Sequence, residues 1–105
     1  MKTVKFVGSS LDDINLFPAD ARRQAGYQLF KVQAGLQPDD WKPMSSVGRG
    51  VYEIRIHEAG EYRVFYLTKR EDAIYVLHAF QKKTQKTRQT DINLAKQRLK
   101  MLEDD

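Results

Sequence analysis

Five basic side chains stand out as groups that could do chemistry together: Arg55, His57, Arg63, Lys82 and Lys83. The first two alternate with apolar residues in segment 51–57, and the third does so in segment 62–68, a pattern typical of strands with one polar side. If these strands form a hairpin whose apolar sides share the core, their polar side chains lie together on the opposite face. The lysines follow the next apolar segment and would sit at the rim. Arginine forks and lysine point charges on one rigid face suit phosphate groups.

The residue inventory restricts the possible reactions. The chain has no cysteine and two histidines, which excludes disulfides, a cysteine-based zinc site and thiol catalysis and argues against any protein-built metal centre. No Ser-His-Asp spacing and no nucleotide-binding glycine loop is present. We therefore expect no metal and no cofactor. Metal-free RNA cleavage fits this inventory, because the 2′-hydroxyl attacks its own phosphate and the protein supplies alignment, cations and proton transfer.

A second interpretation of the same residues is purely structural. Glu53 lies on the same side of its strand as Arg55, and Glu61 lies close to Arg63 in sequence. The two carboxylates could neutralise the two arginines in cross-strand ion pairs. Both interpretations remain open at this point.

Periodicity predicts the elements that position these residues. A first strand at 3–7 is followed by a short helix with Ser9 or Ser10 as cap and a second helix after Pro18. The second helix has one apolar stripe, formed by Ala21, Ala25, Leu29, Val32 and Leu36. Residues 37–50 are predicted to be a loop, in which Trp41 is either an anchor to the core or a platform for a nucleobase.

Three strands and a last helix complete the order. The strands are expected at 51–57, 62–68 and 73–80, with a charged turn at 69–72 and a basic loop at 81–90. The last helix begins at a cap formed by Thr90 or Asp91 and buries the apolar residues Ile92, Ala95, Leu99 and Leu102. The order β-α-α-β-β-β-α predicts an α+β domain in which helices pack on an antiparallel meander.

The length of the chain predicts one small domain, and its charge predicts binding to polyanions. A chain of 105 residues forms a single domain over 1–105, with a net charge of +4. Residues 80–100 contain seven basic residues and one acid, a local net charge of +6, which attracts polyanions unless it is only a solvated helix face. No segment is long and apolar enough to cross a membrane, and no secretory signal is visible, so we expect a cytoplasmic protein.

Three segments resemble one protein family: Lys-Pro-Met-Ser-Ser-Val-Gly-Arg-Gly-Val-Tyr-Glu-Ile-Arg-Ile at 42–56, Tyr-Arg-Val-Phe-Tyr at 62–66, and Val-Leu-His-Ala-Phe-Gln-Lys-Lys-Thr-Gln-Lys-Thr at 76–87. They look like the HigB-like branch of the RelE/ParE superfamily, which are toxins of type II toxin–antitoxin pairs, many of phage or plasmid origin. The most specific parts are the Glu-x-Arg strand, the Tyr-Arg-x-x-Tyr strand and the Phe-x-Lys-Lys-Thr exit. The resemblance extends from about residue 3 to residue 100. It implies a small, mainly antiparallel sheet with N-terminal helices and a C-terminal helix.

The resemblance also implies a function, because many relatives are mRNA interferases that cleave messenger RNA in the ribosomal A site and so inhibit translation. Carried over to this sequence, it gives catalytic or phosphate-binding roles to five basic residues: Arg55, His57, Arg63, Lys82 and Lys83. We further expect RNA contacts from three residues: Phe65, which could stack on a base, Lys86 and Arg88.

One departure leaves the proton-transfer groups open. RelE-like enzymes often carry a tyrosine or histidine shortly after the basic pair, and residues 84–89 contain neither. Lys82, Lys83, His57 or His78 could supply that role, although His78 in its apolar strand is also a candidate for a core histidine. Tyr66 is a further candidate, but it shares the core side of its strand.

The resemblance leaves three functions to consider. The first is a ribosome-dependent endoribonuclease whose partners are messenger RNA and the ribosome. The second is a ParE-like inhibitor of DNA gyrase, and the third is an inactive basic RNA-binding module. For a toxin, the expected protein partner is a small cognate helix-turn-helix antitoxin that covers the basic face. No membrane and no small-molecule cofactor is expected among the partners.

Overall fold

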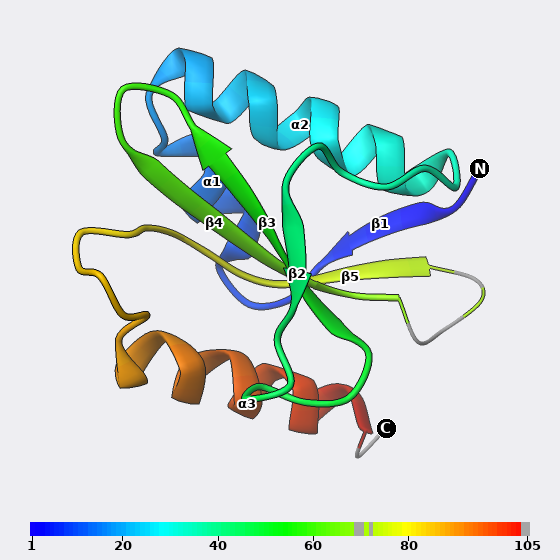
Figure 1. Ribbon diagram of the computed structural model, residues 1–105. Coiled ribbons are helices and arrows are strands. Elements are labelled where there is room, and N and C mark those ends of the chain that lie inside the picture. The colour runs from blue at the N-terminus through cyan, green and yellow to red at the C-terminus, as the bar shows by residue number, and fades with distance from the viewer. Residues whose placement is uncertain (69–70, 72, 104–105) are drawn as a thin grey trace.

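A computed structural model describes residues 1–68, 71 and 73–103, and in these ranges the chain forms a five-stranded sheet between two layers of helices (Figure 1). The strands are β1 (Thr3–Phe6), β2 (Trp41–Pro43), β3 (Val51–His57), β4 (Glu61–Leu67) and β5 (Ala73–Gln81). The helices are α1 (Ser10–Asn15), α2 (Ala19–Gln33) and α3 (Gln89–Glu103). The predicted α+β class is confirmed. The turn predicted at 69–72 falls, apart from residue 71, outside the described residues.

The sheet has the strand order β1-β5-β4-β3-β2. Strands β3, β4 and β5 form the predicted antiparallel meander, while β1 joins β5 in parallel and makes the sheet mixed. The interpretation of 37–50 as a loop without regular structure is wrong at β2, which pairs antiparallel with β3. Three residues are too few to show a periodic pattern among prolines, glycines and serines. Trp41 in β2 packs edge-on against Tyr52, with ring centroids 5.5 Å apart, which supports its role as an anchor.

Helices α1 and α2 pack against one face of the sheet. Four of the five residues in the predicted stripe of α2 are buried there: Ala21, Ala25, Leu29 and Val32. The prediction for Leu36 is wrong, because α2 ends at Gln33 and Gly35 turns the chain with a φ of +83°, which leaves Leu36 59% exposed. The small side chains of the two alanines allow the helix backbone to approach the sheet closely.

The other face of the sheet packs against α3 and forms a second core. Apolar residues of β3, β4 and β5 meet Ala95 and Leu99 of α3 there. Arg98 of the same helix is also buried and donates hydrogen bonds to the carbonyl oxygen of Leu77 at 2.8 Å and to Oγ of Ser9 at 3.0 Å. One of the seven cations counted over 80–100 therefore holds the fold together instead of facing a ligand.

The start of α3 corrects the predicted cap. The helix begins at Gln89, and Asp91 lies inside its first turn, where the carboxylate is buried and contacts Nε2 of His78 at 2.8 Å. Asp91 therefore does not precede the helix as a cap, and its buried carboxylate is partnered by the imidazole of β5. The first turn of α3 is thus tied to β5.

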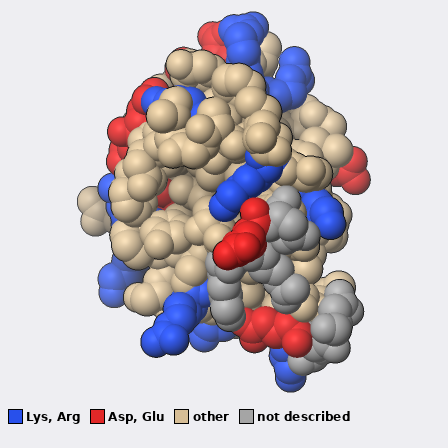
Figure 2. Space-filling model, turned by 90° about the vertical axis from the view of Figure 1, so that its right-hand side faces the viewer, with Lys and Arg blue, Asp and Glu red and all other residues tan. Residues whose placement is uncertain are grey.

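The termini and the end of α2 lie on the right of Figure 1, the side that Figure 2 turns toward the viewer. On the described part of that face, positively and negatively charged side chains are interspersed with uncharged ones (Figure 2). The basic loop between β5 and α3 lies on the opposite side, on the left of Figure 1. Within the described residues, no helix combines the length and the apolar character needed to cross a membrane.

Three glycine substitutions test how α3 is fixed to the rest of the fold. In Gly8→Ala the residue keeps a φ of +59° and its Cβ would lie 2.6 Å from Nε of buried Arg98. We expect the free energy of unfolding, measured by urea denaturation, to fall by about 2–4 kcal/mol from backbone strain and overpacking together.

Two matched variants separate these causes. Gly35→Ala has a φ of +83° and nothing within 4 Å, so it reports backbone strain alone, about 1–2 kcal/mol. Gly26→Ala lies inside α2 with nothing within 4 Å and should stabilise the protein by about 0.5–1 kcal/mol. A loss in Gly8→Ala no larger than that in Gly35→Ala would contradict the importance of the Arg98 contact.

Candidate functional site

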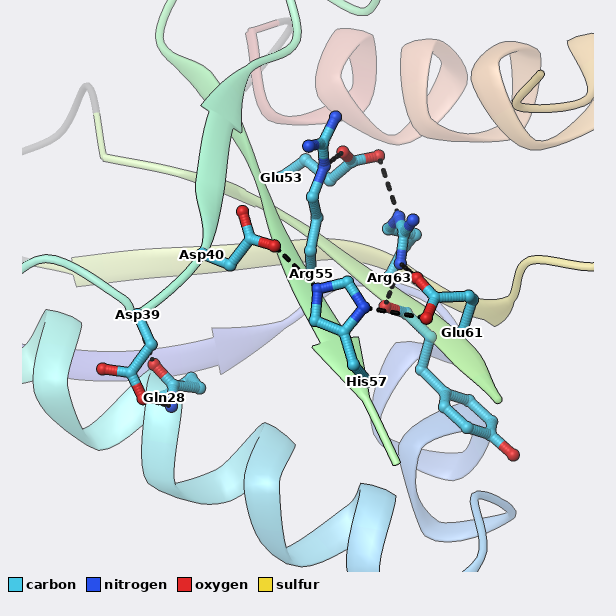
Figure 3. Close-up of polar contacts among 9 residues, drawn as sticks. Gln28, Asp39, Asp40, Glu53, Arg55, His57, Glu61 and Arg63 are labelled. Carbon is cyan, nitrogen blue, oxygen red and sulfur yellow. Dashed lines mark hydrogen bonds and ion pairs between the residues drawn. The ribbon is translucent and has the colours of Figure 1, made fainter. Parts of the chain in front are cut away.

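The predicted polar residues of β3 and β4 lie on the face of the sheet that also carries α3 (Figure 3). The register places Arg55 opposite Arg63 and His57 opposite Glu61. The alternate positions of both strands point to the α1 and α2 core, as the alternation predicted. The hairpin and its sidedness are therefore confirmed.

Glu53 lies at the centre of this face and is 1% exposed. Its Oε1 accepts a hydrogen bond from Nε of Arg55 at 3.1 Å, and its Oε2 lies 3.8 Å from Nε of Arg63, beyond hydrogen-bond distance. Within the described part of the chain, neither Oε2 of Glu53 nor Nε of Arg63 has a hydrogen-bond partner. A carboxylate so deeply buried is tolerated only beside opposite charge, so both arginines compensate Glu53.

Arg63 is itself nearly buried and is held on its other side by Glu61. Its Nη1 donates to Oε1 of Glu61 at 3.0 Å and to the carbonyl oxygen of Tyr62 at 3.0 Å. Hydrogen bonds from His57 and from Arg63 hold the pKa of the Glu61 carboxyl below its ordinary value. The Arg63 guanidinium is therefore fixed between two carboxylates.

His57 connects this hairpin to the segment before β2. Its Nδ1 lies 2.8 Å from a carboxylate oxygen of Glu61, and its Nε2 lies 2.7 Å from one of Asp40. The hydrogen bond with Asp40, followed by that with Glu61, raises the pKa of the imidazole above its ordinary value. Both ring nitrogens donate when His57 is protonated, so the imidazolium ties the two carboxylates together.

These contacts form one continuous series, the ion-pair chain, which consists of Asp40, His57, Glu61, Arg63, Glu53 and Arg55 (Figure 3). With His57 protonated, three cations face three carboxylates and the series is neutral. The predicted carboxylate partners of the arginines are thus confirmed, but Arg55–Glu53 and Arg63–Glu61 are pairs within one strand, and of the three pairs only Glu53–Arg63 is cross-strand. The open cationic surface expected from the strands is not formed by Arg63, whose side chain is 7% exposed, whereas that of Arg55 is 32% exposed.

The basic loop after β5 adds cations beside the ion-pair chain. The backbone N–H of Lys82 donates to the carbonyl oxygen of Glu61 at 2.7 Å, which fixes the start of the loop against β4. Lys83, Lys86 and Arg88 are exposed, and Nε of Arg88 lies 3.5 Å from the Asp91 carboxylate. The start of the lysine-rich loop, predicted at the rim of the sheet, therefore lies next to Glu61 of the ion-pair chain.

A family comparison now bears on this arrangement. The model of a family described as "Phage derived protein Gp49-like" matches residues 12–100, which contain every residue of the ion-pair chain and the whole basic loop. The chain belongs to the Gp49-like family. This is a phage-derived, toxin-like family within the RelE/HigB-type toxin group, and the sheet and helices are consistent with a RelE-like fold. A toxin family implies an antitoxin partner. A search of curated proteins gives no match.

The predicted contact of Phe65 with RNA is not supported in this Gp49-like protein. Its ring is 0% exposed and packs edge-on against Phe80 at 5.3 Å and against His78 at 6.2 Å. The alternation of β4 correctly placed Phe65 away from the first core. It did not show that α3 creates a second core on that face.

Two further candidates for proton transfer are internal. His78 stacks on Phe80 and contacts the buried Asp91, the arrangement of a core histidine with a partner, although its Nδ1 has none among the described residues. Tyr66 belongs to the first core, on the other face of the sheet, and burial raises the pKa of its hydroxyl to about 12. Neither lies in the ion-pair chain.

Sequence reasoning missed Asp40 as a partner of His57. Asp40 stands just before β2, in a segment predicted to be loop, and the backbone N–H of Arg55 donates to its carbonyl oxygen at 2.9 Å. The neighbouring Asp39 is held to α2 by Gln28 at 2.8 Å and by Lys31. Two adjacent acids before a short edge strand carry no signal that would identify their partners. No group of three potential ligands among the described residues is arranged to hold a metal ion.

His57 makes the stability of the hairpin depend on pH. Because its pKa is raised in the folded state, the imidazolium contributes stability that is fully present below the unfolded value of 6.5 and is lost as pH rises through the folded pKa. We expect wild-type stability to fall over this interval and the stability of His57→Gln to change less. The change in the free energy of unfolding is small, because the His57 side chain is half-exposed and solvent screens its ion pairs. Urea unfolding at a series of pH values measures both proteins.

The assignment of the cause can be checked by NMR. The Asp40→Asn variant should move the imidazole titration of His57 back toward 6.5, because the Asp40 hydrogen bond is the largest cause of the raised pKa. The spectrum of His57→Gln identifies the signal and separates it from that of His78. Titration of wild-type His57 at or below 6.5 contradicts the geometry described above.

Proposed function

We propose that this Gp49-like protein is the toxin of a type II toxin–antitoxin pair and inhibits translation as a HigB-like endoribonuclease that cuts messenger RNA on the ribosome. The observation that supports this most is the direct opposition of Arg55 and Arg63 beside the buried Glu53. Like charges opposite each other destabilise a sheet, and two polar atoms there lack hydrogen bonds among the described residues. A phosphate oxygen placed between the two arginines would offset their like charges and accept the hydrogen bond that Nε of Arg63 does not make. Oε2 of Glu53 is itself an acceptor and gains no hydrogen bond from a phosphate.

In this mechanism the arginines bind the phosphate that reacts. Its non-bridging oxygens accept hydrogen bonds from Arg55, which is partly exposed, and from Arg63 after its contact with Glu61 loosens. Lys82 and Lys83 add positive charge from the loop. The cations stabilise the charge that accumulates on the equatorial oxygens as the 2′-oxygen attacks phosphorus and the bond from phosphorus to the 5′-oxygen breaks.

His57 is the proposed acid of this reaction, and Glu61 is the proposed base. The hydrogen bonds with Asp40 and Glu61 raise the pKa of His57 and so favour the protonated imidazole, which is the form that an acid must have before it donates. Its Nε2 turns from Asp40 to the leaving 5′-oxygen and gives it a proton, while Glu61 takes the proton of the 2′-hydroxyl. The two transfers balance, and the products are a 2′,3′-cyclic phosphate and a 5′-hydroxyl.

The ribosome has a positioning role in this proposal. The groove beside the ion-pair chain, where Arg55 and His57 meet the segment before β2, is open to solvent. A shallow site holds a flexible message poorly, and alignment is a large part of the rate of such a reaction. A ribosome that holds the message in an extended path would supply it. A cognate helix-turn-helix antitoxin that covers the same basic face would stop cleavage.

Gyrase inhibition is the second candidate, and one observation favours it. Arg63 lies between two carboxylates and Glu53 compensates Arg55, so the arginines could be purely structural, as in a toxin that acts by binding alone. The exposed lysines would then contact a protein.

Two arginine variants test the nuclease. We expect Arg55→Ala and Arg63→Lys to slow message cleavage about 100- to 1,000-fold, because each removes directed N–H donors from the transition state. Either alanine variant leaves Glu53 beside one cation fewer. Lysine is chosen at 63 because Arg63 is nearly buried, so alanine there would also leave a cavity, whereas water can take the place of the partly exposed Arg55. Primer extension on a defined message in a purified translation reaction measures the cuts.

The matched control is Arg23→Ala, which removes one exposed arginine that is paired with Asp20 on α2. It should cleave like the wild type, and a message with 2′-deoxy nucleotides at the cut should stay intact. Equal cleavage by folded Arg55→Ala would refute the assignment of this residue. Intact messages together with inhibited supercoiling by purified gyrase would favour the second candidate.

A further inference from the structure

An open groove runs between two loops that are far apart in sequence. One wall is the segment from Lys42 to Ser46 at the end of β2, and the other is the loop from Lys82 into the start of α3. The lysine and hydroxyl side chains of the two walls are those of Lys42, Ser45, Ser46, Lys82, Lys86 and Thr87. This groove is distinct from the smaller one beside Arg55 and His57.

The charge of this groove differs from that of the ion-pair chain. Three lysines line it and no aspartate or glutamate does, among the residues that the structure describes. Within the same residues, none of the three ammonium groups has an ion-pair partner, whereas both arginines of the ion-pair chain have carboxylates. The hydroxyl groups on both walls add neutral donors. The groove therefore presents uncompensated positive charge that is available to an anion.

The groove also adjoins the proposed cleavage site. Lys42 is the register partner of Glu53, and the backbone of Lys82 is bonded to Glu61, so each wall begins next to a member of the ion-pair chain. A strand of nucleic acid that places one phosphate at Arg55 can therefore continue along the lysines without leaving this side of the sheet.

We propose that this lysine groove binds the phosphodiester backbone of single-stranded RNA next to the bond that is cut, and that Lys42 is one of its contacts. The inference rests on the proposed function and gives the site a second, non-catalytic part. Lysines act as point charges that follow a backbone without reading bases, and hydroxyl groups donate to phosphate oxygens. Affinity for the strand is then set by the groove, while the arginines act on one phosphate.

Binding to an RNA that cannot be cut tests the groove separately from cleavage. The probe is a fluorescent ten-nucleotide 2′-O-methyl RNA, which lacks the attacking hydroxyl, and anisotropy gives its affinity over a series of salt concentrations. We expect Lys42→Gln and Lys86→Gln each to weaken binding about two- to five-fold at low salt. Each should also reduce the slope of log affinity against log salt by about 0.7, the value for one lost phosphate contact to a single strand.

The matched controls are Lys96→Gln and Lys100→Gln, which remove the same charge from exposed positions of α3 that do not line the groove. They should bind nearly as the wild type does, and thermal melting verifies that all four variants fold. Equal weakening by groove and control variants would overturn the inference, since the net charge alone would then govern binding. The same conclusion follows if a glutamate-rich peptide of equal charge binds as tightly as the RNA and loses affinity in Lys42→Gln, because the groove would then take an acidic protein segment.

The two proposals fail in different ways. If the RNA binds through the groove but messages stay intact on the ribosome, the groove remains an RNA-binding site and the nuclease proposal fails. If Lys42→Gln and Lys86→Gln bind the RNA as the wild type does while the wild type cuts messages, the groove proposal fails alone. Lys86 lies in an exposed loop, so its variant remains informative even if Lys42→Gln in β2 does not fold.

Discussion

The burial of one carboxylate constrains the rest of this site. Glu53 is 1% exposed at the centre of β3, where an unpaired charge would cost several kcal/mol. Only cations on the same face can compensate it, and Arg55 from its own strand and Arg63 from β4 do so. A slip of one residue between β3 and β4 would move Arg63 into the α1 and α2 core and leave Glu53 without it. The register of the hairpin and the position of the arginines are therefore parts of one electrostatic requirement.

This requirement changes what the arginines can do. A guanidinium that already faces carboxylates attracts a distant polyanion weakly, because the opposite charges cancel beyond a few ångströms. At contact distance the balance differs, since a phosphate can take the N–H groups that the carboxylates leave free. In the proposed reaction the ion-pair chain thus favours a phosphate that is already in place and discriminates against loosely bound anions. Attraction over longer distances has to come from other residues, and the lysines of the groove have the uncompensated charge for it.

The sequence predicted the structure correctly where apolar and polar side chains alternate along a strand. The alternation over 51–57 and 62–68 predicted both strands and the side of each residue, and the near-continuous apolar segment 73–80 predicted a strand buried on both faces. It failed where tertiary contacts decide the outcome. The burial of Phe65 depends on α3, and the pairing of His57 depends on Asp40 in an irregular segment. Asp91, predicted as a possible cap, lies inside the helix and contacts His78. Charge counting failed at Arg98 for the same reason, since a count does not distinguish an exposed cation from one that bonds a carbonyl oxygen in the core.

The separation of neutralised arginines from free lysines also bears on how an antitoxin could act. A partner that covers only the lysine groove would block the long-range attraction of RNA and leave the reacting residues unchanged. At high salt this attraction is already screened, so the inhibition by such a partner would become weaker. A partner that inserts a carboxylate or an arginine into the ion-pair chain would instead compete at contact distance, where screening is weak, and its effect would persist at high salt. The salt dependence of neutralisation therefore distinguishes the two modes, because it follows from which of the two sets of cations the partner occupies.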